Sequence, residues 1–369
     1  MKDINMVKSI HYLRGIAALF VVLFHLRGYV NNTYVQSNLG DLLFVNGAFG
    51  VDLFFVISGF IICFATQKKE YFYPLKFFIR RFFRIYPLLI LSVSIYFIFL
   101  TIKKGSTGLD SWFIWSIIPL QIDYHAGAPF FGYNVLAIAW TLTYEISFYI
   151  IFLASMIISH KYRAILCSSI ILTMVLSTQL MSVTPTLNGI NTNYIKNDFI
   201  TLISSPIYID FVYGIISYVI YIHILPALSI YKGTVLNVLL ISTITVTTVL
   251  IFTTKNIDHG PLGWGVMAFI IVVATTLMDA SFTTAKNKPL IMLGNISFSL
   301  YMWHYIFIEI TNTYFPSISM NGFYTLVIMT TCSIAIASIS FNLIEIPSIN
   351  LSKKIISWID RNNPERVVS

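Results

Sequence analysis

Long apolar stretches, separated by short polar connections, run through the whole sequence. About ten of these stretches have the roughly 20 residues that an α-helix needs to cross a bilayer. The pattern therefore predicts an all-α polytopic transmembrane bundle, in which an even number of spans puts both termini on one side. The predicted spans are residues 10–30, 47–66, 86–102, 136–159, 163–181, 201–222, 235–254, 261–278, 290–312 and 323–344.

Composition supports a membrane protein and excludes several other classes. Of the 369 residues, 57% are hydrophobic and 10% are charged, whereas soluble domains are about one quarter charged. These values exclude a soluble globular enzyme, a disordered chain and a disulfide-linked scaffold. The first apolar stretch is long, contains Arg14 and His25, and lacks a small-residue cleavage site. We therefore expect a retained first span rather than a signal peptide.

The distribution of basic residues predicts the orientation. The 23 Lys and Arg residues outnumber the 15 Asp and Glu residues, but they gather at span ends, so nucleic acid is rejected as a partner. With both termini in the cytoplasm, only a few basic residues lie outside: Arg27, Lys103, Lys104, Lys196 and Lys255. We therefore expect one transmembrane domain over residues 1–346 and a short amphipathic cytoplasmic tail over residues 347–369.

Ionisable side chains inside the spans are the candidate functional residues, because lipid makes them costly. Arg14 and His25 are eleven positions apart in the first span, which places them on one helix face about 16 Å apart along the axis. Arg14 is then an interfacial anchor or a functional cation. His25, in the outer half, is either a general base or a buried helix–helix hydrogen-bonding group.

The second span brings a carboxylate to a depth comparable to that of His25. Asp52 lies about one turn below the outer surface, and we expect it to orient the His25 imidazole; the alternative is an acidic residue that the helix dipole favours. Gly59 shares a face with Asp52 and predicts a close helix approach. His125 and His259 belong to outer loops, where we expect solvated side chains.

A basic stripe precedes the third span. Lys76, Arg80 and Arg84 follow i, i+4, i+8 spacing, with Arg81 beside them. We expect this helix to lie in the cytoplasmic interface and to end at Tyr86. It binds phospholipid head groups on one interpretation and a multiply phosphorylated soluble ligand on the other.

Two further spans carry polar faces. In the fourth span Glu145 lies near mid-membrane and needs a partner, for which Arg or His is the obvious choice. The ninth span has a polar face that serves as helix–helix contact or as cavity lining, formed by Ser297, Ser299, Tyr301, Trp303 and His304. No pair of the three cysteines has metal-ligand spacing, so no metal is expected.

Taken in order, these motifs resemble the acyltransferase 3 family of membrane-bound acyltransferases. Each motif is weak alone, but six in series over nearly the whole chain are specific. The motifs are Arg14–Ala18 with His25, Gly50–Phe60, Arg80–Pro87, Trp140–Glu145, Ile296–His304 and Glu345–Pro347. The chain resembles the stand-alone members, without the extracytoplasmic hydrolase-like domain of others.

The resemblance implies an O-acetyltransferase of the bacterial cytoplasmic membrane. It implies transfer of an acyl group, most often acetyl, from cytoplasmic acyl-CoA to a carbohydrate hydroxyl, as in lipopolysaccharide O-antigen or exopolysaccharide. The expected catalytic residues are His25, Arg14, Asp52 and Glu145. The residues expected to bind acetyl-CoA are Arg14, Lys76, Arg80, Arg81, Arg84 and Tyr86. The residues expected to bind the carbohydrate acceptor are Trp140, Tyr144, Ser297, Tyr301, Trp303 and His304.

The residues fit this chemistry physically. The phosphates of coenzyme A suit the basic stripe and Arg14, and the pantetheine arm would thread between helices toward His25. Direct attack by the acceptor hydroxyl, with His25 as base, is the preferred route, and an acyl-histidine relay is the alternative. Candidates for stabilising the thioester oxyanion are Tyr144, Tyr301 and Trp303.

Two other functions compete with acyl transfer. A proton-coupled transporter or flippase of a glycan precursor would use the buried carboxyl groups as a proton relay: Asp52, Glu145, Asp210 and Glu309. A non-catalytic sensor would bind the acyl donor without turnover. Consumption of acyl-CoA by the purified protein separates the enzyme from both alternatives.

Overall fold

The computed structural model describes residues 7–105, 110–191, 195, 197–228, 234–281, 286–316 and 322–362. Within these segments the chain is mainly helical, with two isolated β-bridges and no strand. The predicted all-α polytopic bundle is confirmed. Lys196 of the predicted outer loop and residues 363–369 of the predicted tail lie outside the described residues.

The long helices follow the predicted spans closely. They are α1 (Lys8–Leu26), α3 (Phe49–Ala65), α4 (Tyr73–Lys104), α6 (Trp140–Ile158), α7 (Arg163–Leu180), α9 (Tyr208–Leu228), α10 (Thr234–Thr253), α11 (Trp264–Ser281), α12 (Lys288–Tyr314) and α13 (Phe323–Ser340). In the described part of the chain, nine helical segments are long and apolar enough to cross a membrane. The apolar helix Trp264–Asp279, at the predicted eighth span, is shorter.

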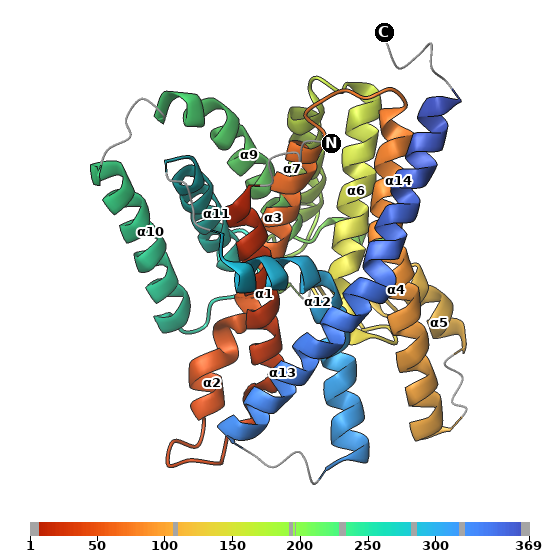
Figure 1. The fold of residues 1–369 in the computed structure, drawn as a ribbon, viewed down its shortest axis with the longest axis vertical. Helices are drawn as coiled ribbons and strands as arrows, with labels where there is room; N and C mark the ends of the chain where they lie inside the picture. The colour runs from red at the N-terminus through yellow and green to blue at the C-terminus, as the bar shows by residue number, and fades with distance from the viewer. Residues whose placement is uncertain are drawn as a thin grey trace.

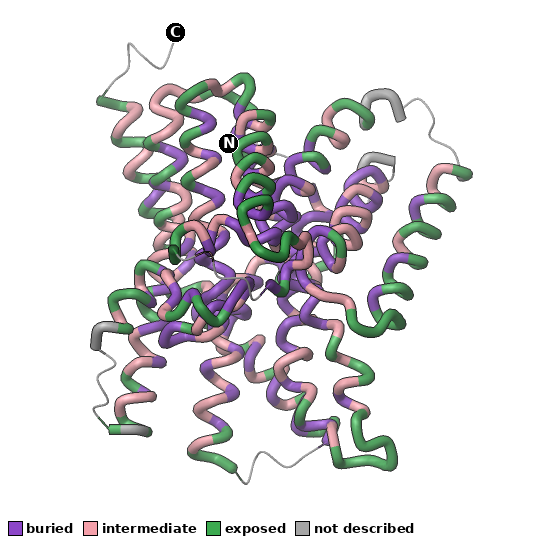
Figure 2. Tube along the Cα trace, turned by 180° about the vertical axis from the view of Figure 1, so that it is seen from behind, coloured by how far each residue is buried: buried purple, intermediate pink, exposed green. Residues whose placement is uncertain are grey.

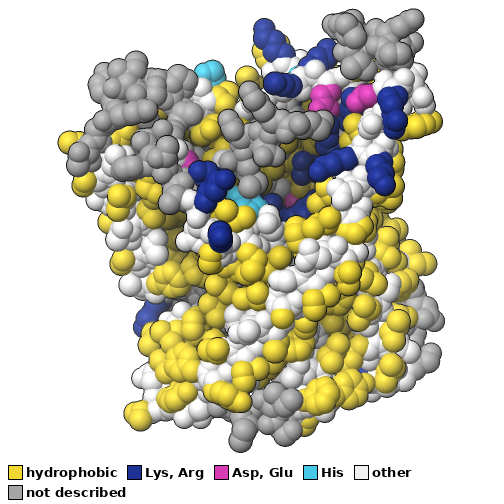
Figure 3. Space-filling view, viewed as in Figure 1, with side chains coloured by type: hydrophobic (Ala, Val, Ile, Leu, Met, Phe, Trp, Pro, Cys, Tyr) yellow, Lys and Arg dark blue, Asp and Glu magenta, His cyan; other side chains and the backbone are white. Residues whose placement is uncertain are grey.

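Four of the described helices are shorter. They are α2 (Leu39–Phe44), α5 (Asp110–Ile117), α8 (Asp198–Ile203) and α14 (Ile346–Arg361). The start of α1, the start of α4 and the end of α14 lie toward the same end of the molecule, at the top in Figure 1. Lys and Arg side chains gather at this end, around a recess, whereas the lower part of the same face is mostly hydrophobic (Figure 3). This asymmetry agrees with the predicted orientation.

The centre of the bundle is formed by α1, which packs against α3 and α12, and by α3, which packs against α9. Buried residues concentrate where these helices meet, and exposed residues dominate the peripheral helices (Figure 2). Gly59 on α3 lies directly against α9, since a Cβ atom added to it would be 2.2 Å from the Phe211 carbonyl oxygen. The close approach predicted for this glycine is confirmed.

Substituting Gly59 tests this contact. Gly59→Ala should lower the free energy of unfolding by about 1–3 kcal/mol, because the added methyl group must push two helix backbones apart. Gly28→Ala is the matched control, since a Cβ atom at Gly28 meets nothing within 4 Å. The melting temperature of each variant in detergent measures the difference, and equal melting temperatures would contradict the packing.

One helix differs from its prediction. The basic stripe was expected to form a separate interfacial helix ending at Tyr86, but α4 continues without a break through Pro87 to Lys104. Packing explains the continuity, because the residues that follow Pro87, including Leu88 and Leu89, are buried in the core. The stripe is thus an extension of a spanning helix and not a separate helix lying on the membrane surface.

The predicted tail also begins as part of a longer helix. A π-helical turn over Phe341–Glu345 joins α13 directly to α14. In Figure 1 α13 runs diagonally across the front of the bundle, and α14 then rises beside α4. The turn points Glu345 inward, where only 2% of its surface is exposed.

Candidate active site

An inner cavity of about 110 Å³ lies between α1, α3, α4, α6 and α12. Three guanidinium groups from two helices face it, so it suits a ligand that carries several negative charges. Its polar lining residues are Arg14, Ser58, Arg81, Arg84, Thr141, Glu145, Tyr149, Ser297 and Tyr301.

The carboxylate of Glu145 is held by hydroxyl groups. Ser58 donates a hydrogen bond of 3.2 Å to Oε1, and the Tyr149 hydroxyl donates to the same oxygen. The expected Arg or His partner was therefore wrong for direct bonding: three arginines line the same cavity, but none in the described part of the chain forms an ion pair with Glu145.

Arg14 and Arg81 are the cations of the cavity that remain available for a ligand. Within the described residues, Arg14 forms neither an ion pair nor a hydrogen bond, and Arg81 stacks over the Tyr149 ring at 5.5 Å with its Nε unpaired. Burying a guanidinium without a partner is costly, which favours an anionic ligand beside these two groups.

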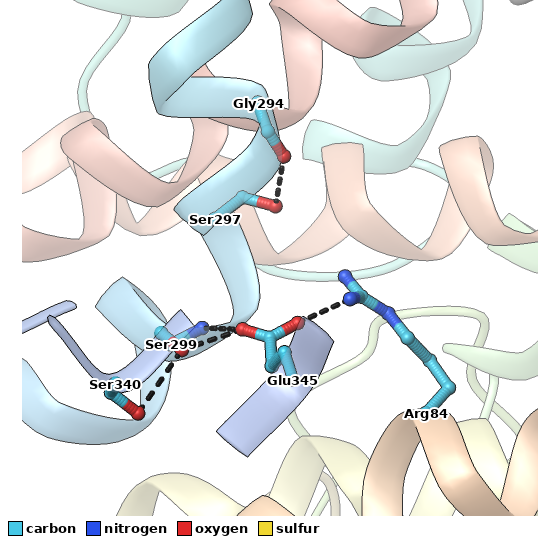
Figure 4. A network of polar contacts seen from close by, with 6 residues as sticks. All are labelled: Arg84, Gly294, Ser297, Ser299, Ser340 and Glu345. Carbon is cyan, nitrogen blue, oxygen red and sulfur yellow. Dashed lines mark hydrogen bonds and ion pairs between the residues drawn. The ribbon is translucent and has the colours of Figure 1, made fainter. Parts of the chain in front are cut away.

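Arg84, in contrast, is already neutralised. Its Nη1 donates to Oε2 of Glu345, while Oε1 of Glu345 accepts hydrogen bonds from the backbone N–H of Ser299 at 3.1 Å and from its hydroxyl at 2.5 Å. Figure 4 shows the Glu345 carboxylate lying between Ser299 and Arg84. This network fixes the junction of α13 and α14 to α4 and α12.

The rest of the basic stripe is paired outside the inner cavity. Lys76 forms a 2.6 Å ion pair with Asp360 on α14, and Arg80 forms one of 2.7 Å with Glu70. Tyr86 stacks on Phe82 with ring centroids 4.8 Å apart. The structure thus does not bring Lys76, Arg80 and Tyr86 to the cavity that holds Arg14.

An outer cavity of about 220 Å³ lies nearer the other end of α1. Its lining is mainly aromatic and includes two imidazoles: Phe24, His25, Phe130, Tyr133, Trp140, His259, Tyr301 and Tyr305. Val51 and Tyr301 line both cavities, so they form the wall between them. The Tyr301 hydroxyl is fixed by a 2.9 Å hydrogen bond to the Ile138 carbonyl and a 3.0 Å contact with Thr141 Oγ1.

The hydrogen bonds around His25 define its tautomer. Nδ1 of His25 lies 2.9 Å from the Val21 carbonyl and 3.2 Å from Nε2 of His304. Nδ1 of His304 lies 3.1 Å from the Leu300 carbonyl. Because a carbonyl only accepts, both Nδ1 atoms carry a proton, so in the neutral tautomer of His25 the lone pair lies on Nε2. In this form His25 can accept a proton at Nε2.

Asp52 does not contact His25, so the predicted pairing of these residues was wrong. Oδ2 of Asp52 lies 2.6 Å from Nδ1 of His259, and Oδ1 accepts a 2.7 Å hydrogen bond from the Gly260 backbone N–H. Asp52 lies in the first turn of α3, and its partners His259 and Gly260 lie in the loop before α11.

His259 was expected to be solvated, and this was wrong as well: only 6% of its surface is exposed. The Gly189 backbone N–H donates to the His259 carbonyl at 2.8 Å, and Asn188 donates to Asp258 at 2.7 Å, so a second loop holds it in place. Gly260 has a φ of +98°, which favours glycine. The glycines and the proline of residues 260–265 were the signal for a tight, packed loop. His125 is exposed, as expected.

The other predicted residues lie in four different places. Ser297 lines the inner cavity, Trp140 lines the outer one, and His304 lies behind His25. Tyr144 and Trp303 line neither cavity. The Tyr144 hydroxyl bonds to the Pro129 carbonyl and Ser205, and the Trp303 indole donates to Ser340 at 2.7 Å.

In the segments that the structure describes, no group of three His, Cys, Asp or Glu residues could hold a metal ion. The chemistry of both cavities rests on guanidinium, carboxylate, hydroxyl and imidazole groups.

A helical membrane bundle with a basic inner cavity and a histidine-bearing outer cavity is suited to moving a group between ligands on opposite sides. A family model for an acyltransferase domain matches residues 7–342. The chain therefore belongs to the acyltransferase 3 family of membrane acyltransferases, as the sequence motifs predicted.

Relatives of known name point the same way. The chain is 27% identical to peptidoglycan O-acetyltransferase OatA of Listeria monocytogenes, over 92% of this chain and 55% of the relative. It is 26% identical to O-acetyltransferase OatA of Staphylococcus aureus, over 91% and 56%. It is 24% identical to the exopolysaccharide production protein ExoZ of Rhizobium meliloti, over 71% and 76%.

The chain spans about half the length of the OatA relatives. No solved structure matches it.

Proposed function

We propose that this protein transfers an acetyl group from acetyl-CoA, bound from the cytoplasm, to a hydroxyl of a cell-envelope polysaccharide in a bacterial cytoplasmic membrane. The observation that carries the proposal is the pair of cavities that share Val51 and Tyr301 as a wall. One cavity offers cations for a phosphorylated donor, and the other offers a neutral imidazole for an alcohol. The names of the OatA and ExoZ relatives support a polysaccharide acceptor.

Arg14 and Arg81 bind the phosphates or the pyrophosphate arm of the donor. Both face the inner cavity without a bonded carboxylate among the described residues, whereas Lys76, Arg80 and Arg84 each have one. The aromatic lining of the outer cavity, including Trp140 and Tyr133, suits a sugar ring with its apolar faces and polar edge.

His25 is the general base of the transfer. Its Nε2 takes the proton of the acceptor hydroxyl as the hydroxyl oxygen bonds to the acyl carbon, and the carbon–sulfur bond then breaks. The thiolate leaves toward the inner cavity and is protonated there. His304 and the Val21 carbonyl accept from Nδ1 and stabilise the imidazolium that forms on His25.

Reconstitution tests the proposal. Purified protein in lipid nanodiscs is incubated with radiolabelled acetyl-CoA and either peptidoglycan fragments or an exopolysaccharide. We expect label in the polysaccharide and a matching release of free coenzyme A. Movement of a glycan precursor across vesicles without acetyl-CoA consumption would favour the flippase instead, and donor binding without turnover would favour the sensor; either result overturns the proposal.

The donor site makes a separate prediction. Arg81→Ala should weaken acetyl-CoA binding about 10- to 100-fold, since a charge-assisted hydrogen bond contributes about 1.5–3 kcal/mol. Arg80→Ala is the matched control one position away, because Arg80 pairs with Glu70 outside the cavity. Isothermal titration with acetyl-CoA measures both, and equal weakening by the two substitutions would contradict the assignment.

A further inference from the structure

Asp52 and His259 form a buried hydrogen-bonded pair that the transfer described so far does not use. Asp52 is completely buried, and His259 lines the outer cavity together with His25. The His259 ring is enclosed by Phe130, Trp140 and Trp264, with ring centroids 5.8, 5.8 and 4.9 Å away. Its orientation is therefore fixed by a carboxylate behind it and by aromatic rings around it.

A second buried carboxyl group adjoins this pair. Asp210 on α9 is completely buried and interacts with Asp52, and no other described residue bonds to its two oxygens. In the described segments, His259 is the one side chain able to carry a positive charge that bonds to either carboxyl group. A buried carboxylate requires a positive or strongly donating partner, and among the described residues His259 and the Gly260 backbone N–H supply the hydrogen bonds to Asp52.

The two imidazoles of the outer cavity thus have opposite surroundings. His25 has only neutral neighbours at Nδ1, namely the Val21 carbonyl and His304, and exposes a lone pair at Nε2. His259 has a carboxylate oxygen 2.6 Å from Nδ1, and an imidazolium in this position donates a hydrogen bond from Nε2–H. Such a contrast between two titratable groups in one site is typical of a base and an electrophile that act together.

We infer that His259 is a second catalytic residue, which donates a hydrogen bond from Nε2–H to the carbonyl oxygen of the acyl group. This inference rests on the proposed acetyl transfer. As the acceptor oxygen bonds to the acyl carbon, negative charge develops on the carbonyl oxygen, and the imidazolium stabilises it. His259 keeps its proton throughout; the hydroxyl proton goes to His25, and the sulfur leaves with the electron pair of the broken bond.

The side chains considered for this role from the sequence have other hydrogen bonds. The hydroxyl of Tyr301 donates to the Ile138 carbonyl, that of Tyr144 to the Pro129 carbonyl, and the indole of Trp303 to Ser340. His259 is better placed than these three. Its hydrogen bond to Asp52 uses only Nδ1 and leaves Nε2 for the acyl group.

The experiment measures steady-state acetyl transfer by H259Q, with H125Q as the control because His125 is an exposed loop histidine. We expect kcat to fall about 10²- to 10³-fold in H259Q, the loss seen when one oxyanion donor is removed, with KM for donor and acceptor unchanged. Retention of the wild-type kcat by H259Q, or a loss confined to KM, would overturn the inference.

A second variant separates catalysis from folding. D52N keeps the size of the side chain but removes its charge, and it should lower kcat through the same imidazole. The double variant D52N/H259Q should then be no slower than H259Q alone. If the two substitutions instead damaged the structure independently, their free-energy effects would add and the double variant would be slower than either single variant. Acetyl-CoA binding at the inner cavity checks that each variant is folded.

Failure of this inference is distinguishable from failure of the proposed function. If the wild-type protein transfers no acetyl group, the function itself is wrong. If the wild-type protein and H259Q transfer equally well, only the role of His259 is wrong.

Discussion

Replacing His25 by alanine should lower kcat for acetyl transfer by about 10²- to 10⁴-fold, the contribution typical of a positioned general base. The reason is the orientation of the ring: the Val21 carbonyl and His304 occupy Nδ1 and leave Nε2 free at the outer cavity. Binding of acetyl-CoA should be unchanged, because the inner cavity with Arg14 lies on the other side of the Tyr301 wall. Initial rates with saturating donor, together with titration of the donor, measure the two effects.

His304→Ala should cause an intermediate loss, because His25 then keeps only the Val21 carbonyl at Nδ1. His125→Ala is the control for loss of a histidine elsewhere. A His25→Ala protein that binds the donor and still acetylates at the wild-type rate would remove the basis for acid–base catalysis at this cavity.

Replacing Glu345 by alanine should lower the free energy of unfolding by about 3–5 kcal/mol, the usual cost of removing one partner from a buried ion pair. The substitution leaves Arg84 without its carboxylate and leaves the Ser299 hydroxyl and backbone N–H without their acceptor (Figure 4). Urea or thermal unfolding in detergent, followed by circular dichroism, measures the change.

A double-mutant cycle isolates the pair. Arg84→Met removes the charge and keeps much of the apolar stem, so the double variant with Glu345→Ala should be more stable than the sum of the single losses indicates. Glu70→Ala is the matched control, because its pair with Arg80 is more than one third exposed on both sides and should contribute about 0–1 kcal/mol. Equal losses for Glu345→Ala and Glu70→Ala would contradict the importance of burial.

The spans could be predicted from the sequence because each depends on local composition. A stretch of about 20 apolar residues must form a helix in lipid, whatever its neighbours are. The prediction failed at Pro87, where the residue type favours a helix end but packing of the following leucines carries α4 onward. It also separated α14 from the preceding span, although a π-helical turn joins them.

The candidate site was predicted less completely, because periodicity gives the depth and face of a residue but not its partner. Asp52 and His25 were expected to pair, yet Asp52 bonds to His259, and His25 contacts the Val21 carbonyl and His304. Likewise, the i, i+4, i+8 spacing identified the basic stripe but could not reveal that Asp360 and Glu70 neutralise two of its members.

The sequence by itself determined the membrane-spanning helical fold, the family, and the positions of the ionisable groups, since these depend on residue type and on spacing within one helix. Only the tertiary structure decided which groups meet: Asp52 with His259, His25 with His304, and Arg84 with Glu345. Each of these pairs joins residues more than 200 positions apart, and their contact depends on how separate helices and loops pack around two cavities.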